Sequence, residues 1–133
     1  MSRSVFTLLA ILMLSACGGT SYVVQGQGPF IGADIQVDVD EEGGTNMVEV
    51  KVTNLVPPNR VGEGIAQYVV WIAPIGGQPS RVASLVYDAG NRQGTATATF
   101  PDPQFEVIVS AEAEGQPTMP STNIVARQRV DAR

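Results

Sequence analysis

The sequence predicts an all-β domain, an antiparallel sandwich of about seven strands that follows a cleaved signal peptide. Two observations predict this fold class. Apolar and polar residues alternate with a period of two along most of the chain, and clusters of Gly, Pro, Asn and Asp separate the alternating segments. The chain has 133 residues, of which 44% are hydrophobic, so it is long enough and apolar enough for one folded domain.

The N-terminus has the pattern of a secretory signal. Arg3 supplies a positive charge, and Val5 to Leu14 form an apolar run that only Thr7 interrupts. Ten helical residues span about 15 Å, which is half of the roughly 30 Å needed to cross a bilayer. A charged start and a short apolar core therefore predict a removed signal peptide over residues 1–16 rather than a membrane-spanning helix.

The end of this leader resembles the lipobox of bacterial lipoproteins. Leu14, Ser15 and Ala16 place an aliphatic residue and two small ones directly before Cys17. The resemblance implies cleavage before Cys17, a diacylglyceryl group on its thiol and, commonly, an acylated amino group. Two or more acyl chains give durable membrane attachment. Gly18 is not the Asp that marks inner-membrane retention in a Gram-negative host, which favours the outer membrane and leaves its periplasmic or surface face open.

Residues 17–33 are expected to comprise the lipidated cysteine and a flexible tether, because glycines and small polar residues are frequent there. One alternative concerns Tyr22, Val23 and Val24, which could instead pair with the edge of a sheet. The sandwich domain is then expected over residues 34–133.

The first strands of that domain are expected at 34–40 and 48–53. Ile35, Val37 and Val39 alternate with polar residues, and three valines repeat the pattern in the second segment. The acidic, glycine-containing segment between them predicts a hairpin turn.

The third expected strand, 67–73, is continuously apolar and closed by Pro74, as a central strand covered on both faces would be. The later segments alternate again, and turn residues separate them. The remaining strands are expected at 81–88, 94–100, 105–112 and 123–130.

Seven short strands with these turns resemble the immunoglobulin or fibronectin-III sandwich, and Trp71 lies on the third, where such domains often bury a tryptophan. A second likeness runs through YVVWIAP, from Tyr68, and FEVIVSAEAEGQPTMPSTNIV, from Phe105. It loosely resembles the extracytoplasmic domain of anti-sigma-K-type regulators. This chain lacks that family's cytoplasmic and membrane-spanning segments, so the likeness implies the sandwich and not sigma-factor regulation.

Composition narrows the classes of function. The chain has no histidine and a single cysteine, which removes an internal disulfide and the usual ligands of zinc, copper and haem. The net charge of −5 and the scattered arginines disfavour nucleic-acid binding. With no nucleophile-and-base pattern, we expect no enzyme and no cofactor.

One acidic segment, residues 38–49, partly matches the EF-hand calcium loop. The match is poor because the segment joins two expected strands rather than two helices. Calcium binding on a β loop is the alternative to a plain hairpin. The candidate ligands are Asp38, Asp40, Glu42 and Glu49.

Three aromatic residues could form a sugar-binding platform: Trp71, Tyr68 and Tyr87. The competing interpretation places them in the core. The sequence thus predicts a membrane-anchored lipoprotein that binds or scaffolds an envelope protein, with a carbohydrate-binding module as the alternative. Burial of the Trp71 indole would decide against the second.

Overall fold

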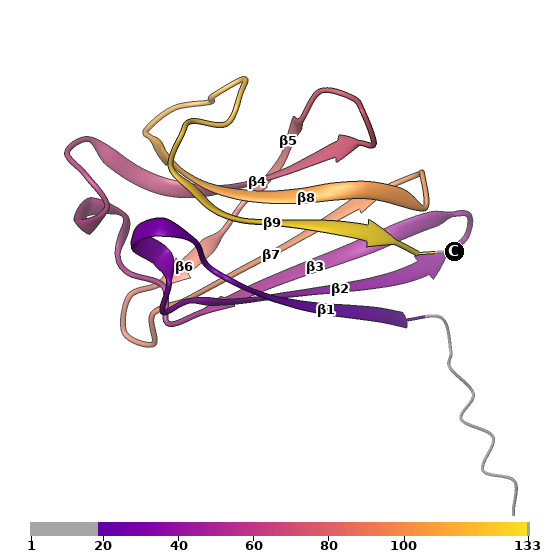
Figure 1. Ribbon diagram of the computed structural model, residues 1–133, viewed down its shortest axis with the longest axis horizontal. Coiled ribbons are helices and arrows are strands. Elements are labelled where there is room, and N and C mark those ends of the chain that lie inside the picture. Colours follow the sequence, from indigo (N-terminus) through magenta and orange to yellow (C-terminus); the bar gives the residue numbers. More distant parts are fainter. Residues whose placement is uncertain (1–18, 133) are drawn as a thin grey trace, which may run out of the picture.

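A computed structural model describes residues 19–132 and confirms the all-β class, with two antiparallel sheets packed as a sandwich (Figure 1). Sheet A has the order β1-β2-β3-β7-β6, and sheet B has the order β5-β4-β8-β9. Sheet A comprises β1 (Gly19–Gln25), β2 (Asp34–Glu42), β3 (Thr45–Thr53), β7 (Gln93–Phe100) and β6 (Val86–Asp88). Sheet B comprises β5 (Ser80–Ser84), β4 (Ile65–Pro74), β8 (Gln104–Ala113) and β9 (Ile124–Asp131). Two short 3-10 helices are η1 (Gly28–Phe30) and η2 (Pro58–Arg60).

The strand order confirms the immunoglobulin-like arrangement. Strands β2-β3-β7-β6 follow the A-B-E-D order of such domains, and β9-β8-β4-β5 follow the G-F-C order extended by C′. Strand β1 adds a further strand beside β2. Among residues 19–132, no helix is both long and apolar enough to span a membrane.

The tether expected over residues 17–33 is wrong for the part that the structure describes. Every residue of β1 pairs with β2, and Phe30 and Ala33 are buried in the core. The alternative, in which residues 22–24 pair with the edge of a sheet, is correct, because they pair with β2. In addition, the Tyr22 hydroxyl donates to the Asp131 carbonyl at 3.1 Å and accepts from the Asp131 N–H at 3.0 Å. Tyr22 and Val24 alternate with exposed neighbours, and this apolar face outweighs the glycines around it.

The fourth expected strand is divided into β5 and β6. Between them the chain crosses from sheet B to sheet A at Leu85, which is buried and donates its N–H to the Tyr68 carbonyl at 2.9 Å. A Cβ on Gly94 would lie only 3.0 Å from Leu85 Cδ1, so the glycine makes room for the crossing residue. With β1 and this division, residues 19–132 form nine strands where about seven were expected.

The hairpin between β2 and β3 is confirmed. Glu42 pairs with Thr45, and the two-residue loop has positive φ at both Gly43 (60°) and Gly44 (85°). These are the signs of a type I′ turn, whose twist matches that of the flanking strands. An EF-hand loop is therefore wrong here, because the segment continues two strands instead of joining helices.

The main core lies between the sheets. Ile35 and the alternating valines of β2 and β3 share this core with Tyr68, Val70 and Ile72 of β4 and with Phe105 of β8. The chain enters β1 at the same end of the sandwich as the β2–β3 turn and the end of β9, whereas η1, η2 and the loop 114–123 lie at the opposite end (Figure 1). The candidate site lies on the outer face of sheet B.

Candidate binding face of sheet B

The three aromatic candidates do not form a platform. Alternation along β4 turns Tyr68 into the inter-sheet core and Trp71 to the outer face of sheet B, and both side chains are buried. Trp71 packs there with Val69 and Ile108 in a small separate cluster. The sugar-binding interpretation of Trp71, Tyr68 and Tyr87 is therefore wrong, since they lie on different faces and the indole offers no surface to solvent.

Tyr68 and Tyr87 both form hydrogen bonds to the loop that follows β3. Tyr68 donates its hydroxyl to the Val56 carbonyl and Tyr87 donates to the Leu55 carbonyl, each at 2.6 Å. Their rings lie 6.0 Å apart, tilted by 48°. Burial, with a smaller effect of neighbouring Tyr87, raises the pKa of Tyr68 far above its usual value. Burial also raises the pKa of Tyr87.

We expect stability to fall as the pH rises above about 10, where tyrosine ionises in the unfolded chain. The folded state holds the Tyr68 proton, so its contribution is complete below that pH and is lost above it. Urea unfolding of the wild type and Tyr68→Phe, measured across this range, checks the effect. The variant should lose less stability with pH; an equal loss would show that Tyr68 does not cause the decline.

The calcium candidates lie on one face but do not converge on a single point. Asp38 faces Glu49 across the β2–β3 ladder, while Asp40 faces Met47. Asp38 accepts from Ser21 Oγ at 2.6 Å, so a neighbouring side chain already occupies it. In the described part of the chain, no three Asp, Glu, His or Cys side chains are grouped so as to hold a metal ion. The calcium interpretation of Asp38, Asp40, Glu42 and Glu49 is thus not supported.

The candidate lipidation site, Cys17, lies outside the described residues.

The outer face of sheet B carries a basic surface that the sequence analysis missed. Across the ladder, Ala73, Glu106 and Arg129 form one row. The next row runs Arg81, Trp71, Ile108 and Arg127. We call this surface, with its exposed Arg81, Arg127 and Arg129 around the buried Trp71, the arginine face.

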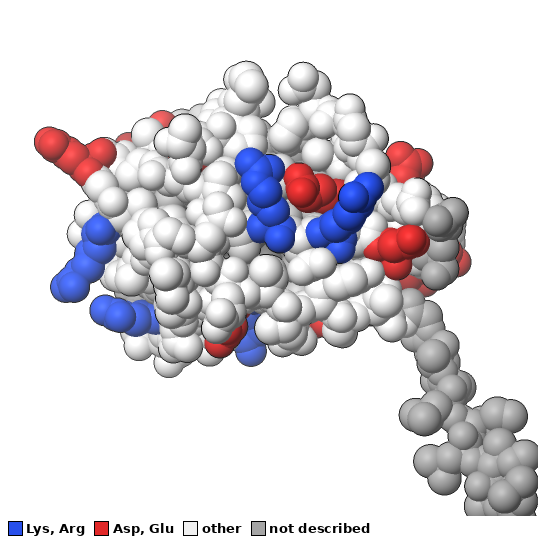
Figure 2. Space-filling view, in the orientation of Figure 1, with Lys and Arg blue, Asp and Glu red and all other residues white. Residues whose placement is uncertain are grey.

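Its ion pairing is incomplete. Arg127 Nη1 lies 3.4 Å from Glu106 Oε1, an exposed pair that adds little to stability. Arg81 Nη2 donates to Ser84 Oγ at 2.8 Å. No acidic side chain within residues 19–132 lies at ion-pair distance from Arg129 or Arg81. Figure 2 shows two basic side chains on either side of an acidic one at the centre of the face in view.

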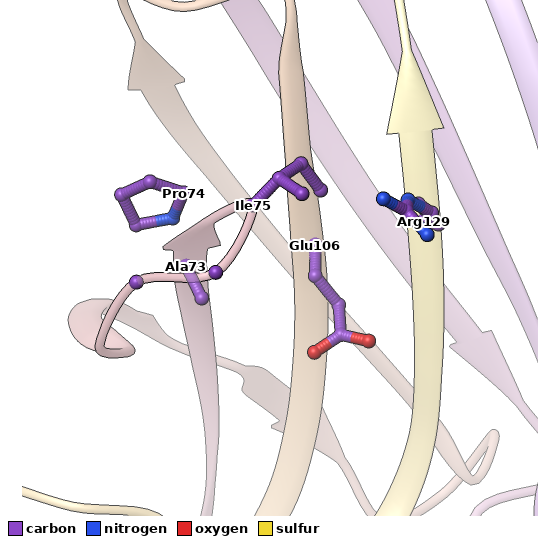
Figure 3. A pocket seen from close by; sticks show the side chains of 7 residues that line it. Ala73, Pro74, Ile75, Glu106 and Arg129 are labelled. Carbon is purple, nitrogen blue, oxygen red and sulfur yellow. The ribbon is translucent and has the colours of Figure 1, made fainter.

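A pocket of about 200 Å³ opens beside Arg129 at the β4–β5 turn. Figure 3 shows Glu106 and Arg129 on adjacent strands, with Pro74 and Ile75 on the turn beside them. The Gly77 N–H donates to the Pro74 carbonyl at 2.8 Å and closes the turn. Ile75 is 43% exposed, so the pocket combines a guanidinium with an apolar rim.

The opposite face of the sandwich has the other charge. On the outer face of sheet A, Lys51 is the one basic side chain of the strands. The acidic side chains there are Asp34, Asp38, Asp40, Glu42, Glu49 and Asp88. Three arginines of this acidic protein thus share one face, whereas Arg60 and Arg92 lie in the connections between strands. The signal in the sequence is the spacing of Arg127 and Arg129, two residues apart in an alternating strand.

A buried network fixes the loop 114–123 at the edge of this face. Trp71 Nε1 donates to Ser110 Oγ at 2.8 Å, and Ser110 Oγ donates to Glu112 Oε2 at 2.5 Å. The same carboxylate oxygen accepts the Ser121 N–H at 2.8 Å. Glu112 is only 5% exposed, and its side chain accepts hydrogen bonds from the chain itself.

Comparisons with known proteins add little. No family model and no curated protein matches this chain. Among solved structures, it is similar to the KRT10-binding region domain of the pneumococcal serine-rich repeat protein PsrP, with 10% sequence identity and a TM-score of 0.39. The match covers 85% of this chain and 97% of that domain. At this similarity, it carries no inference about the ligand or partner of this chain.

Proposed function

We propose that the protein is a lipid-anchored lipoprotein of the bacterial outer membrane whose sandwich domain binds or scaffolds an envelope protein without enzymatic activity. The lipobox-like sequence before Cys17 supports the anchor. Because β1 begins pairing at Gly19, only one residue, Gly18, separates the anchor from the sheet. The domain would therefore stand directly on the membrane, with its loop 114–123 and helix η2 pointing away from it.

The single observation that supports protein binding is the arginine face. An exposed, positively charged surface on an otherwise acidic domain attracts partners of opposite charge and orients them. The chain has no histidine to act as a general base, which supports binding rather than catalysis. The burial of Trp71 removes the support for a carbohydrate-binding module.

Metabolic labelling with an alkyne fatty acid tests the anchor. We expect label and membrane fractionation in the wild type, and loss of both in Cys17→Ser, because the thiol is the acceptor. A matched control moves the thiol four residues along, as Cys17→Ser combined with Ser21→Cys, and should also stay unlabelled. Label that survives in Cys17→Ser would refute the anchor.

Site-specific photo-crosslinking in cells tests the binding function. A photoreactive residue in place of Ile75, at the rim of the pocket, should capture a defined envelope protein. The control places it at Val86, which is 75% exposed on sheet A. Equal capture from both positions would mean that the arginine face is not the binding surface.

A further inference from the structure

We propose that the arginine face binds an extended acidic segment of a partner protein, in which carboxylates recur at every second residue and alternate with apolar side chains. This rests on the proposed function, because it names the chemistry of the partner that the domain would bind. Four features support it: the spacing of the arginines, the pocket, the occupied ends of the β9 edge and the position of Glu106 beside the arginines.

The spacing fits an extended segment. Arg127 and Arg129 are two residues apart on one face of β9, so their attachment points lie about 6.6 Å apart along the strand. Side chains at i and i+2 of an extended peptide repeat at the same distance. A segment that lies parallel or antiparallel to β9 can therefore bring two successive carboxylates to two guanidinium groups. Each guanidinium can donate two N–H groups to the two oxygens of one carboxylate.

The pocket fits the apolar positions of such a segment. Its volume of about 200 Å³ suits one side chain rather than a whole small-molecule ligand, for which pockets of roughly 300–1,000 Å³ are usual. Pro74 and Ile75 form the rim, and Arg129 lines the opposite side. An aliphatic side chain can enter the pocket while a neighbouring carboxylate stays with Arg129.

The segment would lie over the face and not along the edge of β9. The Val125 carbonyl accepts the Gln27 N–H at 2.8 Å, and the backbone of Asp131 is bonded to the Tyr22 hydroxyl. Backbone groups at both ends of β9 are thus already occupied by β1 and the loop after it. Strand addition there would require these bonds to break, whereas binding over the face requires no such change.

Charge favours a discontinuous acidic ligand over a nucleic acid. Glu106 faces Arg129 across the ladder and pairs with Arg127, and the net charge of −5 disfavours a continuous phosphate backbone more than a segment with spaced carboxylates. A peptide can place an uncharged residue opposite Glu106. Glu106 therefore acts as a selective element, because it competes for Arg127 and penalises ligands with a charge at every position.

Fluorescence anisotropy of a labelled peptide of alternating aspartate and valine tests the proposal. The protein is the full mature chain in non-ionic detergent, and a peptide of alternating asparagine and valine is the neutral control. We expect Arg127→Gln and Arg129→Gln each to weaken binding about tenfold, with binding falling as salt increases. Arg60→Gln, in η2 at the far end of the domain, is the matched control and should bind like the wild type.

Glu106→Gln is expected to change peptide binding in the direction opposite to the arginine variants. Removing the competing carboxylate should tighten binding of the acidic peptide, an effect that a merely structural role would not produce. The proposal is overturned if the neutral peptide binds equally well, if Arg60→Gln weakens binding as much as Arg129→Gln, or if no acidic peptide binds. It is also overturned if sedimentation shows self-association that Asp38→Asn on sheet A abolishes, because a second copy would then occupy the face.

These outcomes separate the two proposals. Failure of peptide binding, together with intact fatty-acid labelling and a crosslink from Ile75, would overturn the acidic-segment proposal and leave the anchored binding module. Failure of fatty-acid labelling, together with intact peptide binding, would overturn the lipid anchor and leave the acidic-segment proposal.

Discussion

Replacing Trp71 with alanine is expected to lower the free energy of unfolding by about 3–5 kcal/mol, as for other large aromatic residues removed from packed sites. The indole is fully buried, and its partners Val69 and Ile108 lie on paired strands that cannot move together to fill the space. The substitution also leaves Ser110 Oγ without the N–H that donates to it. Urea unfolding followed by circular dichroism measures the loss.

Trp71→Phe separates packing from hydrogen bonding. Phenylalanine keeps much of the apolar volume but cannot donate to Ser110, so we expect a smaller loss of about 1–2 kcal/mol. A loss below about 1 kcal/mol for the alanine variant would contradict a packed cluster on the outer face, since cavities of this size cost more. Such a result would also reopen the question of an accessible aromatic surface.

The sequence predicts that Trp71 lies in a covered strand, but not on which face. The segment from Gln67 to Ala73 is apolar at successive positions, so its pattern has no period that separates the inner from the outer face. The neighbours on β8 settle this point, because Ile108 pairs with Trp71 while Val107 and Val109 turn into the main core. Burial was predictable from the local sequence, and the second cluster was not.

The two strands that were missed have a similar cause. Strand β1 depends on its pairing with β2, a contact between residues about fifteen positions apart, and its glycine content favours a tether when it is considered alone. The division at Leu85 depends on where the chain changes sheets, which its alternation does not encode. By contrast, the hairpin at Gly43 and Gly44 was predictable because both turn residues are local and need positive φ.

The arginine face, too, could be predicted from the sequence only in part. The sequence shows that Arg127 and Arg129 share one side of a strand. It does not show that Glu106 faces Arg129 from β8 and pairs with Arg127, or that Arg81 joins the same surface from β5. Those relations arise from pairing across four strands, so three arginines that are far apart in the sequence come to share one face only when sheet B forms.

Glu112→Ala is expected to lower the free energy of unfolding by about 2–3 kcal/mol and to release the loop 114–123 locally. The carboxylate accepts from both Ser110 and Ser121, and removing it leaves two donors in a site that water enters poorly. Denaturant unfolding measures the global loss. Amide hydrogen exchange at Ser121 measures the local one, and it should speed up beyond the change in global stability.

Two variants make this prediction specific. Glu112→Gln keeps an oxygen acceptor and should lose less stability than the alanine variant, while Glu114→Ala, at an exposed position in the same loop, should change neither measurement. Unchanged exchange at Ser121 in Glu112→Ala would mean that the carboxylate does not hold the loop. Because this loop leads directly into β9, which carries Arg127 and Arg129, its release should also weaken acidic-peptide binding, though less than the loss of Arg129 itself.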